Sequence, residues 1–344
     1  MQLFLRIFTQ QVGANCAVGP STRMWRRSGY LTSVNSQART ILITGASSGI
    51  GRAVALIAAE GGDHVTLVAR NEAALKHTAR LCKSAGAASA TVSVADVGAD
   101  DAVARCINDA VARHGHLDAV VHCAAVIAYG RTEDIPTGVF DRVLQTNLHG
   151  SINVGRHAVR QLRLQRRGTL VLVGSVAGHI ASPQISPYVI TKWGVRALAR
   201  QLQIENRDLD EVDIAYVAPG GVDTPIYAQG ANYLGFAGRP PPPIASPERV
   251  AHMVLKRVDK GRGRTQTTLA NQAMRLGFTL VPRVFDALAG PMFRMVLTDR
   301  TTAVEPNTGN VFESQGSEER VHGGNGNPWA AIVKNVVAVV KDSR

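Results

Sequence analysis

Short apolar stretches alternate with longer amphipathic stretches from residue 39 to about residue 270. The short stretches are rich in β-branched residues and predict buried strands at 39–44, 64–69, 90–95, 117–122, 169–174, 212–217 and 265–269. The longer stretches repeat with helical spacing and predict helices at 50–60, 72–85, 99–114, 140–164, 188–203 and 247–260. Because such alternation is typical of right-handed crossovers, we expect a doubly wound α/β (Rossmann) fold, with a parallel sheet covered on both faces.

The 344 residues and the hydrophobic content of 45% are sufficient for a large core. No linker or internal repeat divides the alternating region, so we expect one catalytic domain over residues 39–270, with extensions at 1–38 and 271–344. Within that domain, residues 226–247 contain aromatic residues, four consecutive prolines and few charges. We interpret them as an apolar lid over a ligand crevice; the alternative is a disordered loop without a role.

The C-terminal extension begins with a hydrophobic segment, residues 272–297, that charged residues interrupt. A membrane span needs about 20 predominantly apolar residues, so this segment is not one. It packs on the core, pairs subunits or lies on a membrane surface, and the sequence leaves these three open. Residues 305–328, rich in glycine and asparagine, predict an irregular connection before a short helix at 329–341.

The net charge of +12 favours contact with anionic partners. Residues 1–40 contain five arginines and no acidic residue, and the remaining excess is spread over predicted helical faces without interleaved aromatic residues. We therefore favour solvated faces over a specific nucleic-acid site. Residues 1–38 have the composition of a mitochondrial transit peptide if the organism is eukaryotic; a disordered tail or a misassigned start is favoured, which makes the protein cytoplasmic.

Cysteine and histidine usage points away from disulfides and metals. The cysteines are far apart and form no CxxC pair, and the histidines are scattered. We therefore expect a reduced compartment and no metal site. The cysteines are Cys16, Cys82, Cys106 and Cys123.

A glycine-rich turn, residues 44–51, lies between the first predicted strand and the first predicted helix. Glycines at such a turn let the backbone approach a pyrophosphate, and the helix amides and dipole hold the anion. Where the second strand ends, the chain has Arg70 in place of an acidic residue that would bind a ribose hydroxyl. Arg70 favours NADP, with NAD as second choice; the alternative is a solvated strand-end residue. The turn residues expected to bind the cofactor are Gly45, Ser47, Ser48, Gly49, Ile50 and Gly51.

A hydroxyl, a phenol and an ammonium occur at short spacing in the second half of the chain. Ser175 follows a predicted strand, and Tyr188 stands four residues before Lys192 at the start of a helix, so both lie on one helical face. A free phenol with a pKa near ~10 is too weakly acidic for proton exchange at neutral pH, so a nearby ammonium and an oxidised nicotinamide would lower its pKa. We expect Tyr188 to be a general acid/base and Ser175 to bind the substrate oxygen.

Five motifs in chain order resemble those of the short-chain dehydrogenase/reductase family. They are the TGxxxGxG turn at 44–51, Asn147, Ser175, the YxxxK pair of Tyr188 and Lys192, and a PGxxxT turn at 219–224. The resemblance covers about residues 39–270. It implies an NAD(P)-dependent enzyme that acts on CH–OH groups and forms a homo-oligomer.

The resemblance also implies individual roles. Asn147 would anchor a water that links Lys192 to solvent, and Lys192 would hold the nicotinamide ribose. Asp96 would contact adenine and Thr224 the nicotinamide carboxamide. Further cofactor contacts would come from Pro219, Gly220 and Val222.

Each of these residues also has a structural alternative. Ser175 and Asp96 can cap helices, and Asn147 can kink one. Tyr188 can be a core aromatic residue, and Lys192 a surface charge. Ile190 and Val222 are interpreted as packing residues within their motifs.

One turn departs from the family pattern. Where the family usually has Asn-Asn-Ala-Gly, this chain has His122, Cys123, Ala124 and Ala125. Alanine in place of the last glycine requires a backbone without positive φ, and the lost asparagines remove hydrogen bonds that usually tie this strand to its neighbours. We interpret Cys123 as a small buried hydrophobe and His122 as a strand-end donor.

The sequence therefore predicts an NADP-preferring oxidoreductase that moves a hydride to or from a carbonyl or secondary alcohol on an apolar small molecule. Only the apolar segment 226–247 bears on the substrate. The alternatives are a catalytically weak nucleotide-binding regulator on the same fold and a membrane-associated scaffold.

Overall fold

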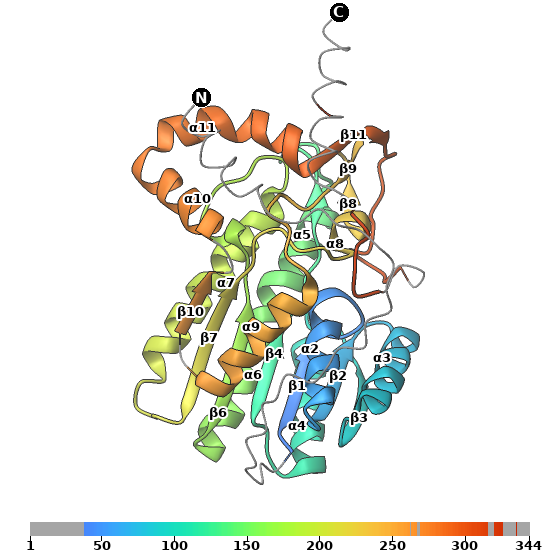
Figure 1. Cartoon of the computed structure of the whole chain (residues 1–344), viewed down its shortest axis with the longest axis vertical. Coiled ribbons are helices and arrows are strands. Elements are labelled where there is room, and N and C mark those ends of the chain that lie inside the picture. Colours follow the sequence, from blue (N-terminus) through green and yellow to red (C-terminus); the bar gives the residue numbers. More distant parts are fainter. Residues whose placement is uncertain (1–37, 262, 267–268, 316–319, 326–334, 336–344) are drawn as a thin grey trace, which may run out of the picture. The chain divides into compact units, whose positions relative to one another are not determined.

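The computed structural model describes residues 38–261, 263–266, 269–315, 320–325 and 335. Seven parallel strands form one sheet in the order β10-β7-β6-β4-β1-β2-β3 (Figure 1). This arrangement confirms the predicted doubly wound fold, and the seventh predicted strand lies two to three residues earlier than expected. The strands are β1 (Thr40–Thr44), β2 (His64–Ala69), β3 (Ser89–Val94), β4 (Ala119–His122), β6 (Gly168–Val173), β7 (Val212–Ala218) and β10 (Gly263–Gln266).

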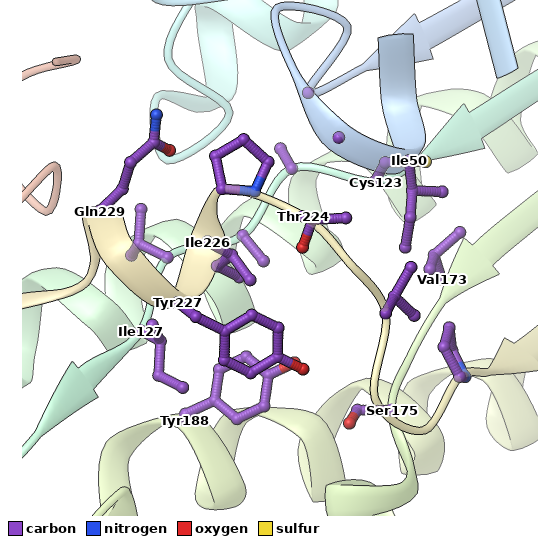
Figure 2. Close-up of a pocket in the computed structure, with 18 of the residues that line it drawn as sticks. Ile50, Cys123, Ile127, Val173, Ser175, Tyr188, Thr224, Ile226, Tyr227 and Gln229 are labelled. Carbon is purple, nitrogen blue, oxygen red and sulfur yellow. The ribbon is translucent and has the colours of Figure 1, made fainter. Parts of the chain in front are cut away.

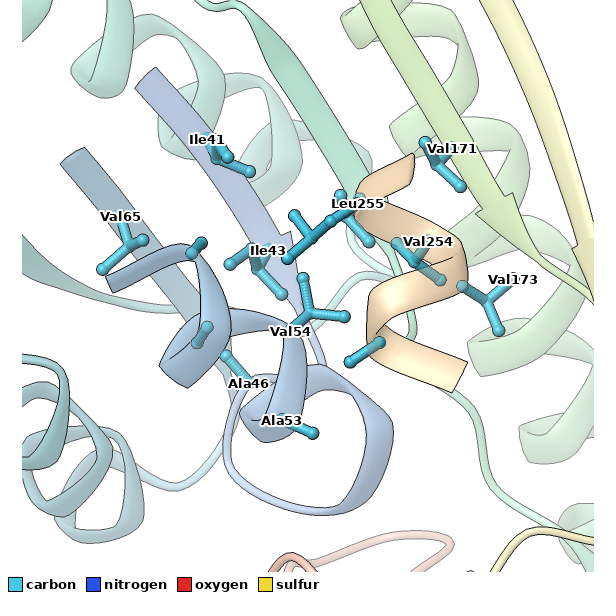
Figure 3. Packing of buried hydrophobic residues seen from close by; sticks show 14 of the residues in the cluster. Ile41, Ile43, Ala46, Ala53, Val54, Val65, Val171, Val173, Val254 and Leu255 are labelled. Carbon is cyan, nitrogen blue, oxygen red and sulfur yellow. The ribbon is translucent and has the colours of Figure 1, made fainter. Parts of the chain in front are cut away.

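Helices cover both faces of the sheet because successive strand residues point to opposite sides. In β1, Ile41 and Ile43 belong to the cluster that α2 (Gly49–Glu60), α3 (Glu72–Ala85) and α9 (Pro247–Lys260) complete. Figure 3 shows α2 and α9 packed over this face. Leu42 points the other way, into the cluster with α4 (Asp100–His114), α6 (Gly150–Gln165) and α7 (Ser186–Glu205).

The long helix predicted at 140–164 is interrupted. The chain forms α5 (Thr137–Leu144), a π-helical turn η1 (Gln145–His149) and then α6. A π turn inserts one extra residue per turn and frequently marks a functional site. Here the turn contains Asn147, so the kink predicted as an alternative for this residue is present.

The strand order reverses direction beside β1. The chain adds β2 and β3 on one side and then returns through α4 to β4 on the other side. The turns that follow β1 and β4 therefore diverge to opposite faces, and ligands of such folds bind in the crevice between them. The two turns are in contact, since a Cβ on Gly45 would lie 2.8 Å from the backbone nitrogen of Ala124.

Residues 226–247, expected to be either an apolar lid or a disordered loop, form three short regular elements. They contain α8 (Ile226–Gln229), β8 (Ala231–Asn232) and β9 (Phe236–Gly238). β8 pairs with β5 (Ala128–Tyr129), and β9 pairs with β11 (Thr298–Ala303). The lid segment is thus tied both to the loop after β4 and to the C-terminal extension.

The C-terminal extension forms α10 (Leu269–Leu280), α11 (Pro282–Met292) and a π turn η3 (Phe293–Leu297) before β11. It belongs to the same compact unit as the sheet. No helix within the described part of the chain is long and apolar enough to span a membrane. The extension 1–37 and most of the helix predicted at 329–341 lie outside the described residues.

Candidate active site

One pocket opens at the crevice beyond the carboxyl ends of β1 and β4. It brings together residues that are far apart in the chain, from the glycine-rich turn to the C-terminal extension. All the predicted site residues except Asn147 line it. Those that do are Gly45, Ser47, Ser48, Gly49, Ile50, Gly51, Arg70, Asp96, Ser175, Tyr188, Lys192, Pro219, Gly220, Val222 and Thr224.

The glycine-rich turn has a shape that requires glycine. Gly45 and Gly49 have φ angles of +69° and +50°, which side chains with a Cβ rarely adopt. A Cβ on Gly51 would lie 2.2 Å from the carbonyl oxygen of Gly45. Ser48, the N-cap of α2, makes no capping side-chain hydrogen bond. A helix N-terminus without a capping side chain at a pocket wall fits a pyrophosphate, so these residues fit a dinucleotide.

Arg70 makes contacts that the sequence did not predict. Its Nη1 donates to the carbonyls of Val311 and Phe312, each at 3.0 Å, and its Nη2 donates to the carbonyl of Asn310 at 2.6 Å. The same C-terminal connection returns to the turn, where the Gly49 N–H donates to the carbonyl of Arg320 at 2.9 Å. Irregular residues beyond 305 therefore form part of the nucleotide half of the pocket.

Asp96 is held by local contacts at the pocket wall. Its carboxylate accepts a 2.8 Å hydrogen bond from the Gly98 N–H and pairs with Arg142. Burial, the largest single influence, raises the pKa of Asp96. The hydrogen bonds from Arg142 and the Gly98 N–H and the charges of Arg142 and Arg70 together outweigh it, so the net pKa lies below the usual value. The N-cap of α4 is Ala99, without a capping side-chain bond. The alternative prediction that Asp96 caps this helix is therefore wrong.

Lys192 is buried, with 5% of its surface exposed, so the surface-charge alternative is wrong. Its ammonium donates to the carbonyl of Val173 at 3.3 Å and lies 5.5 Å from the ring centre of Tyr188. Burial disfavours the charged form and lowers the pKa of Lys192 to about 8. Near neutral pH the Lys192 ammonium can therefore lose its proton readily. It also lies next to the Tyr188 ring.

Ser175 and Tyr188 face the same pocket from β6 and α7 (Figure 2). Ser175 caps the short 3₁₀ helix Val176–Gly178, accepting a 3.1 Å hydrogen bond from the Ala177 N–H, so its capping alternative is also realised. Burial raises the pKa of Tyr188, and a side-chain hydrogen bond with Ser175 opposes that rise.

The side chain of Asn147 does not reach the pocket. It is 1% exposed, donates to the Val126 carbonyl and accepts from the Val126 N–H, both at 2.8 Å. A further 3.2 Å bond joins it to Thr191, next to Lys192 in α7. The amide thus fixes the loop after β4 against the catalytic helix.

The other end of the pocket is apolar. Ile127, Tyr129 and Ile185 form a buried cluster against which Tyr188 and Tyr227 pack. Tyr227 of α8 faces the Tyr188 ring in Figure 2. Ile226 and Tyr227, from the segment expected to be a lid, line the pocket. The sequence missed the contribution of the C-terminal extension, since α10, α11 and η3 add Met274, Met292, Val296 and Leu297 to the lining.

A family model described as short chain dehydrogenase matches residues 39–232. The chain belongs to this family. YxnA, an uncharacterized oxidoreductase of Bacillus subtilis, is 31% identical over 73% of this chain and 71% of its own length. The 3-ketodihydrosphingosine reductase of Bos taurus is 30% identical over 64% of this chain and 68% of its own. The solved alcohol dehydrogenase of Thermococcus sibiricus, complexed with 5-hydroxy-NADP, superposes with a TM-score of 0.59 at 27% identity, covering 67% of this chain and 96% of that one.

As a short-chain dehydrogenase, the protein is an NAD(P)-dependent oxidoreductase, and its unusual turn after β4 can be compared with the family pattern. His122 is 2% exposed; its Nδ1 lies 2.8 Å from the Thr44 hydroxyl and its Nε2 lies 2.9 Å from the Ser151 hydroxyl. Ser151 in turn donates to the Asn147 carbonyl at 2.5 Å. The imidazole therefore bridges the glycine-rich turn to the π turn.

In the series of hydrogen bonds from Thr44 through His122 and Ser151 to Asn147, the number of protons on each group decides which group donates and which accepts. Burial lowers the pKa of His122 to about 3, so the ring is neutral and has one donor and one acceptor. The single Ser151 proton goes to the Asn147 carbonyl, so Ser151 accepts from Nε2–H. Nδ1 must then accept from Thr44, whose oxygen accepts from the Cys123 and Ala124 N–H groups. His122 thus replaces the missing asparagine contacts, and the strand-end donor interpretation holds for Nε2.

The two alanines of the turn are also accommodated. Among the described residues, the non-glycine positions with positive φ are Arg166 and Gln184, so neither Ala124 nor Ala125 needs glycine. Cys123 is half-buried and lines the pocket, and burial raises its thiol pKa to about 12. The thiol is therefore neutral at physiological pH, but it is not the fully buried hydrophobe that the sequence predicted. Ile190, interpreted as a packing residue, is instead 49% exposed.

We expect His122→Asn to remove a pH dependence of stability. The folded-state pKa of about 3 lies below the ordinary 6.5, so the His122 contribution to stability is complete above pH 6.5 and is lost as the pH falls from 6.5 towards 3. Within that window the loss is about 1.4 kcal/mol per pH unit. Urea unfolding of wild type and variant at pH 7, 6 and 5 measures the difference, in which other titrating groups cancel; parallel curves would contradict the neutral buried imidazole.

Proposed function

We propose that this enzyme transfers a hydride between NADP(H) and a carbonyl or secondary alcohol on an apolar small molecule, with Tyr188 as the general acid/base. The observation that carries the proposal is the buried Lys192 ammonium beside the Tyr188 phenol, in the same pocket as Ser175 and the glycine-rich turn. Burying a charge costs several kcal/mol. We therefore infer that this ammonium is kept for the chemistry and not for stability.

Each side chain then has one task during reduction. The bound cofactor supplies the hydride. Ser175 donates a hydrogen bond to the substrate oxygen, which stabilises the negative charge that develops there. Tyr188 gives its proton to that oxygen, and the Lys192 ammonium stabilises the resulting phenolate. In oxidation the same groups act in reverse.

Asn147 would act through its backbone rather than its amide. The amide is committed to Val126 and Thr191, which fixes the position of α7 and so of Lys192. The backbone of the π turn remains next to the buried hydroxyl of Ser151. A water relay from Lys192 would end at this turn, in line with the role that the family implies for Asn147.

For the cofactor, we assign the glycine-rich turn to the pyrophosphate, Asp96 to the adenine and Arg70 to the 2′-phosphate. Arg70 is already oriented by three carbonyls of residues 310–312. A guanidinium held in this way loses little entropy on binding a phosphate. The relative solved with 5-hydroxy-NADP supports the choice of NADP. Contacts near the nicotinamide are assigned to Pro219, Gly220, Val222 and Thr224.

The substrate is assigned from the lining of the far end of the pocket. The walls there are aliphatic and aromatic, with Ile127, Ile185 and Tyr227 around the Tyr188 ring. Such a wall stabilises an apolar body attached to the reacting carbonyl by burying it from water. The Bos taurus relative, named for a 3-ketodihydrosphingosine, supports a lipid-like substrate.

Tyr188→Phe tests the acid/base assignment. It removes the proton donor but keeps the ring, so we expect turnover of a carbonyl panel with NADPH to fall by about 10² to 10⁴-fold. The dissociation constant for NADPH, measured by fluorescence titration, should change little. Tyr233→Phe, on a half-buried tyrosine of the lid, is the control. Retained turnover in Tyr188→Phe would remove this residue from the chemistry.

The pKa of Lys192, about 8, predicts a pH limit for reduction. Below pH 8 the ammonium is charged and stabilises the phenolate; above pH 8 it is neutral and the stabilisation is lost. We therefore expect kcat/KM for carbonyl reduction to fall as the pH rises through about 8. Lys192→Arg keeps the charge to higher pH, so its residual activity should lose this limb. A profile that is flat from pH 7 to 10 in the wild type would contradict the assignment.

Arg70→Gln tests cofactor choice. The glutamine side chain carries no charge for a 2′-phosphate and is too short to keep the hydrogen bonds that Nη1 and Nη2 make to residues 310–312. We expect the ratio of kcat/KM for NADPH to that for NADH to fall by about 10- to 100-fold. Arg80→Gln, on the exposed surface of α3, removes the same charge nearby and should leave the ratio unchanged. An unchanged ratio in Arg70→Gln would exclude Arg70 from specificity.

A further inference from the structure

The helices of the C-terminal extension expose large apolar side chains at a regular spacing. In α10 and α11 every fourth residue from 276 to 292 is apolar and between 40% and 71% exposed, and the last member, in η3, is 37% exposed. Exposed apolar residues scattered singly need no explanation, but a repeated set of them on two successive helices does. We name these residues the apolar row: Leu276, Leu280, Val284, Leu288, Met292 and Met295.

The opposite side of the same helices is apolar as well. Phe278 packs edge-on against Trp193 of α7 and against Phe285, with ring centres 6.1 and 5.2 Å apart. Phe293 is 1% exposed in the cluster beside Tyr188. An ordinary surface helix buries one apolar face and presents a polar one to water. Among the side chains described in α10 and α11, Asn271 is the buried one, and α11 has no buried residue. The apolar side chains that these helices leave exposed therefore fit an additional apolar partner.

The charges around the row indicate the kind of partner. Exposed Arg275, Arg283 and Arg294 stand on this segment with one acidic residue, Asp286. A symmetric contact with a second copy would bring like charges together, which is unfavourable. An anionic lipid surface would neutralise the arginines and take up the apolar side chains. Arginine near such a surface contributes roughly 1 kcal/mol per charge.

The row is continuous with the pocket. Met292 belongs to the apolar row and also lines the pocket. Met274 on α10, which is not part of the row, lines the pocket too. We propose that α10 and α11 lie in the interface of an anionic bilayer, with the apolar row in the acyl region, and that an apolar substrate dissolved in the membrane enters the pocket beside Met292. The lipid contact stands independently of the proposed function, whereas the route of entry rests on it.

Flotation of the full-length protein with vesicles tests the contact without any turnover. We expect binding to vesicles of phosphatidylglycerol and phosphatidylcholine, and weak binding to phosphatidylcholine alone. Leu280→Glu with Val284→Glu places charges in the row, at exposed positions that do not line the pocket. The double variant should lower the partition coefficient by at least about tenfold. Replacing the three arginines by glutamine should remove the preference for anionic vesicles.

The matched control is Leu164→Glu with Ile204→Glu, which adds the same charge at exposed apolar positions of α6 and α7, 75% and 44% exposed. It should bind vesicles like the wild type. Equal loss in control and test variants, or no binding by the wild type, would overturn the proposal. So would a wild-type dimer that the row variant converts to a monomer while vesicle binding is absent. All variants should reduce a water-soluble carbonyl at the same rate as the wild type. If the wild type does not reduce any such carbonyl, the result counts against the proposed function and not against the lipid contact.

Discussion

The site depends on keeping the Lys192 ammonium out of water. The protein alone offers it the Val173 carbonyl and the Tyr188 ring, and this poor solvation lowers its pKa to about 8. An ammonium with so few partners is available to stabilise a phenolate, because the phenolate supplies the negative charge that Lys192 does not meet among the other described residues. Such a position exists only because α7 is pressed against β6 by an apolar core, so packing energy from the whole sheet offsets the cost of the buried charge.

The second constraint is that the glycine-rich turn and the π turn must keep a fixed position relative to each other. In this chain a single directed hydrogen-bond chain, from Thr44 through His122 and Ser151 to the Asn147 carbonyl, joins them. Each member uses its one donor once, so no other tautomer of His122 fits. A departure from the family pattern is thus compensated within the same few ångströms, and it leaves the glycine-rich turn and the π turn coupled.

The fold and most of the site were predictable because their causes are local. Alternation and helical spacing place Ile41, Leu42 and their equivalents, and the motif residues then meet at the strand ends by topology alone. The π turn at Asn147 was not predictable, since its helical spacing continues unbroken in sequence. The partners of Arg70 lie about 240 residues away in an irregular segment, and no local pattern marks such a contact.

The same distinction separates reaction from substrate. The groups to which we assign the proton transfer stand just after β6 and on α7, inside the region that the family model matches. The walls that would hold the substrate come partly from that region, through Ile127, Ile185 and α8, and partly from α10, α11 and η3, which lie outside it. Because α10 and α11 line the pocket and also expose large apolar side chains, the helices that shape the pocket are poorly suited to water. A substitution on α10 or α11 that changes the substrate pocket therefore also changes how these helices contact water or a partner.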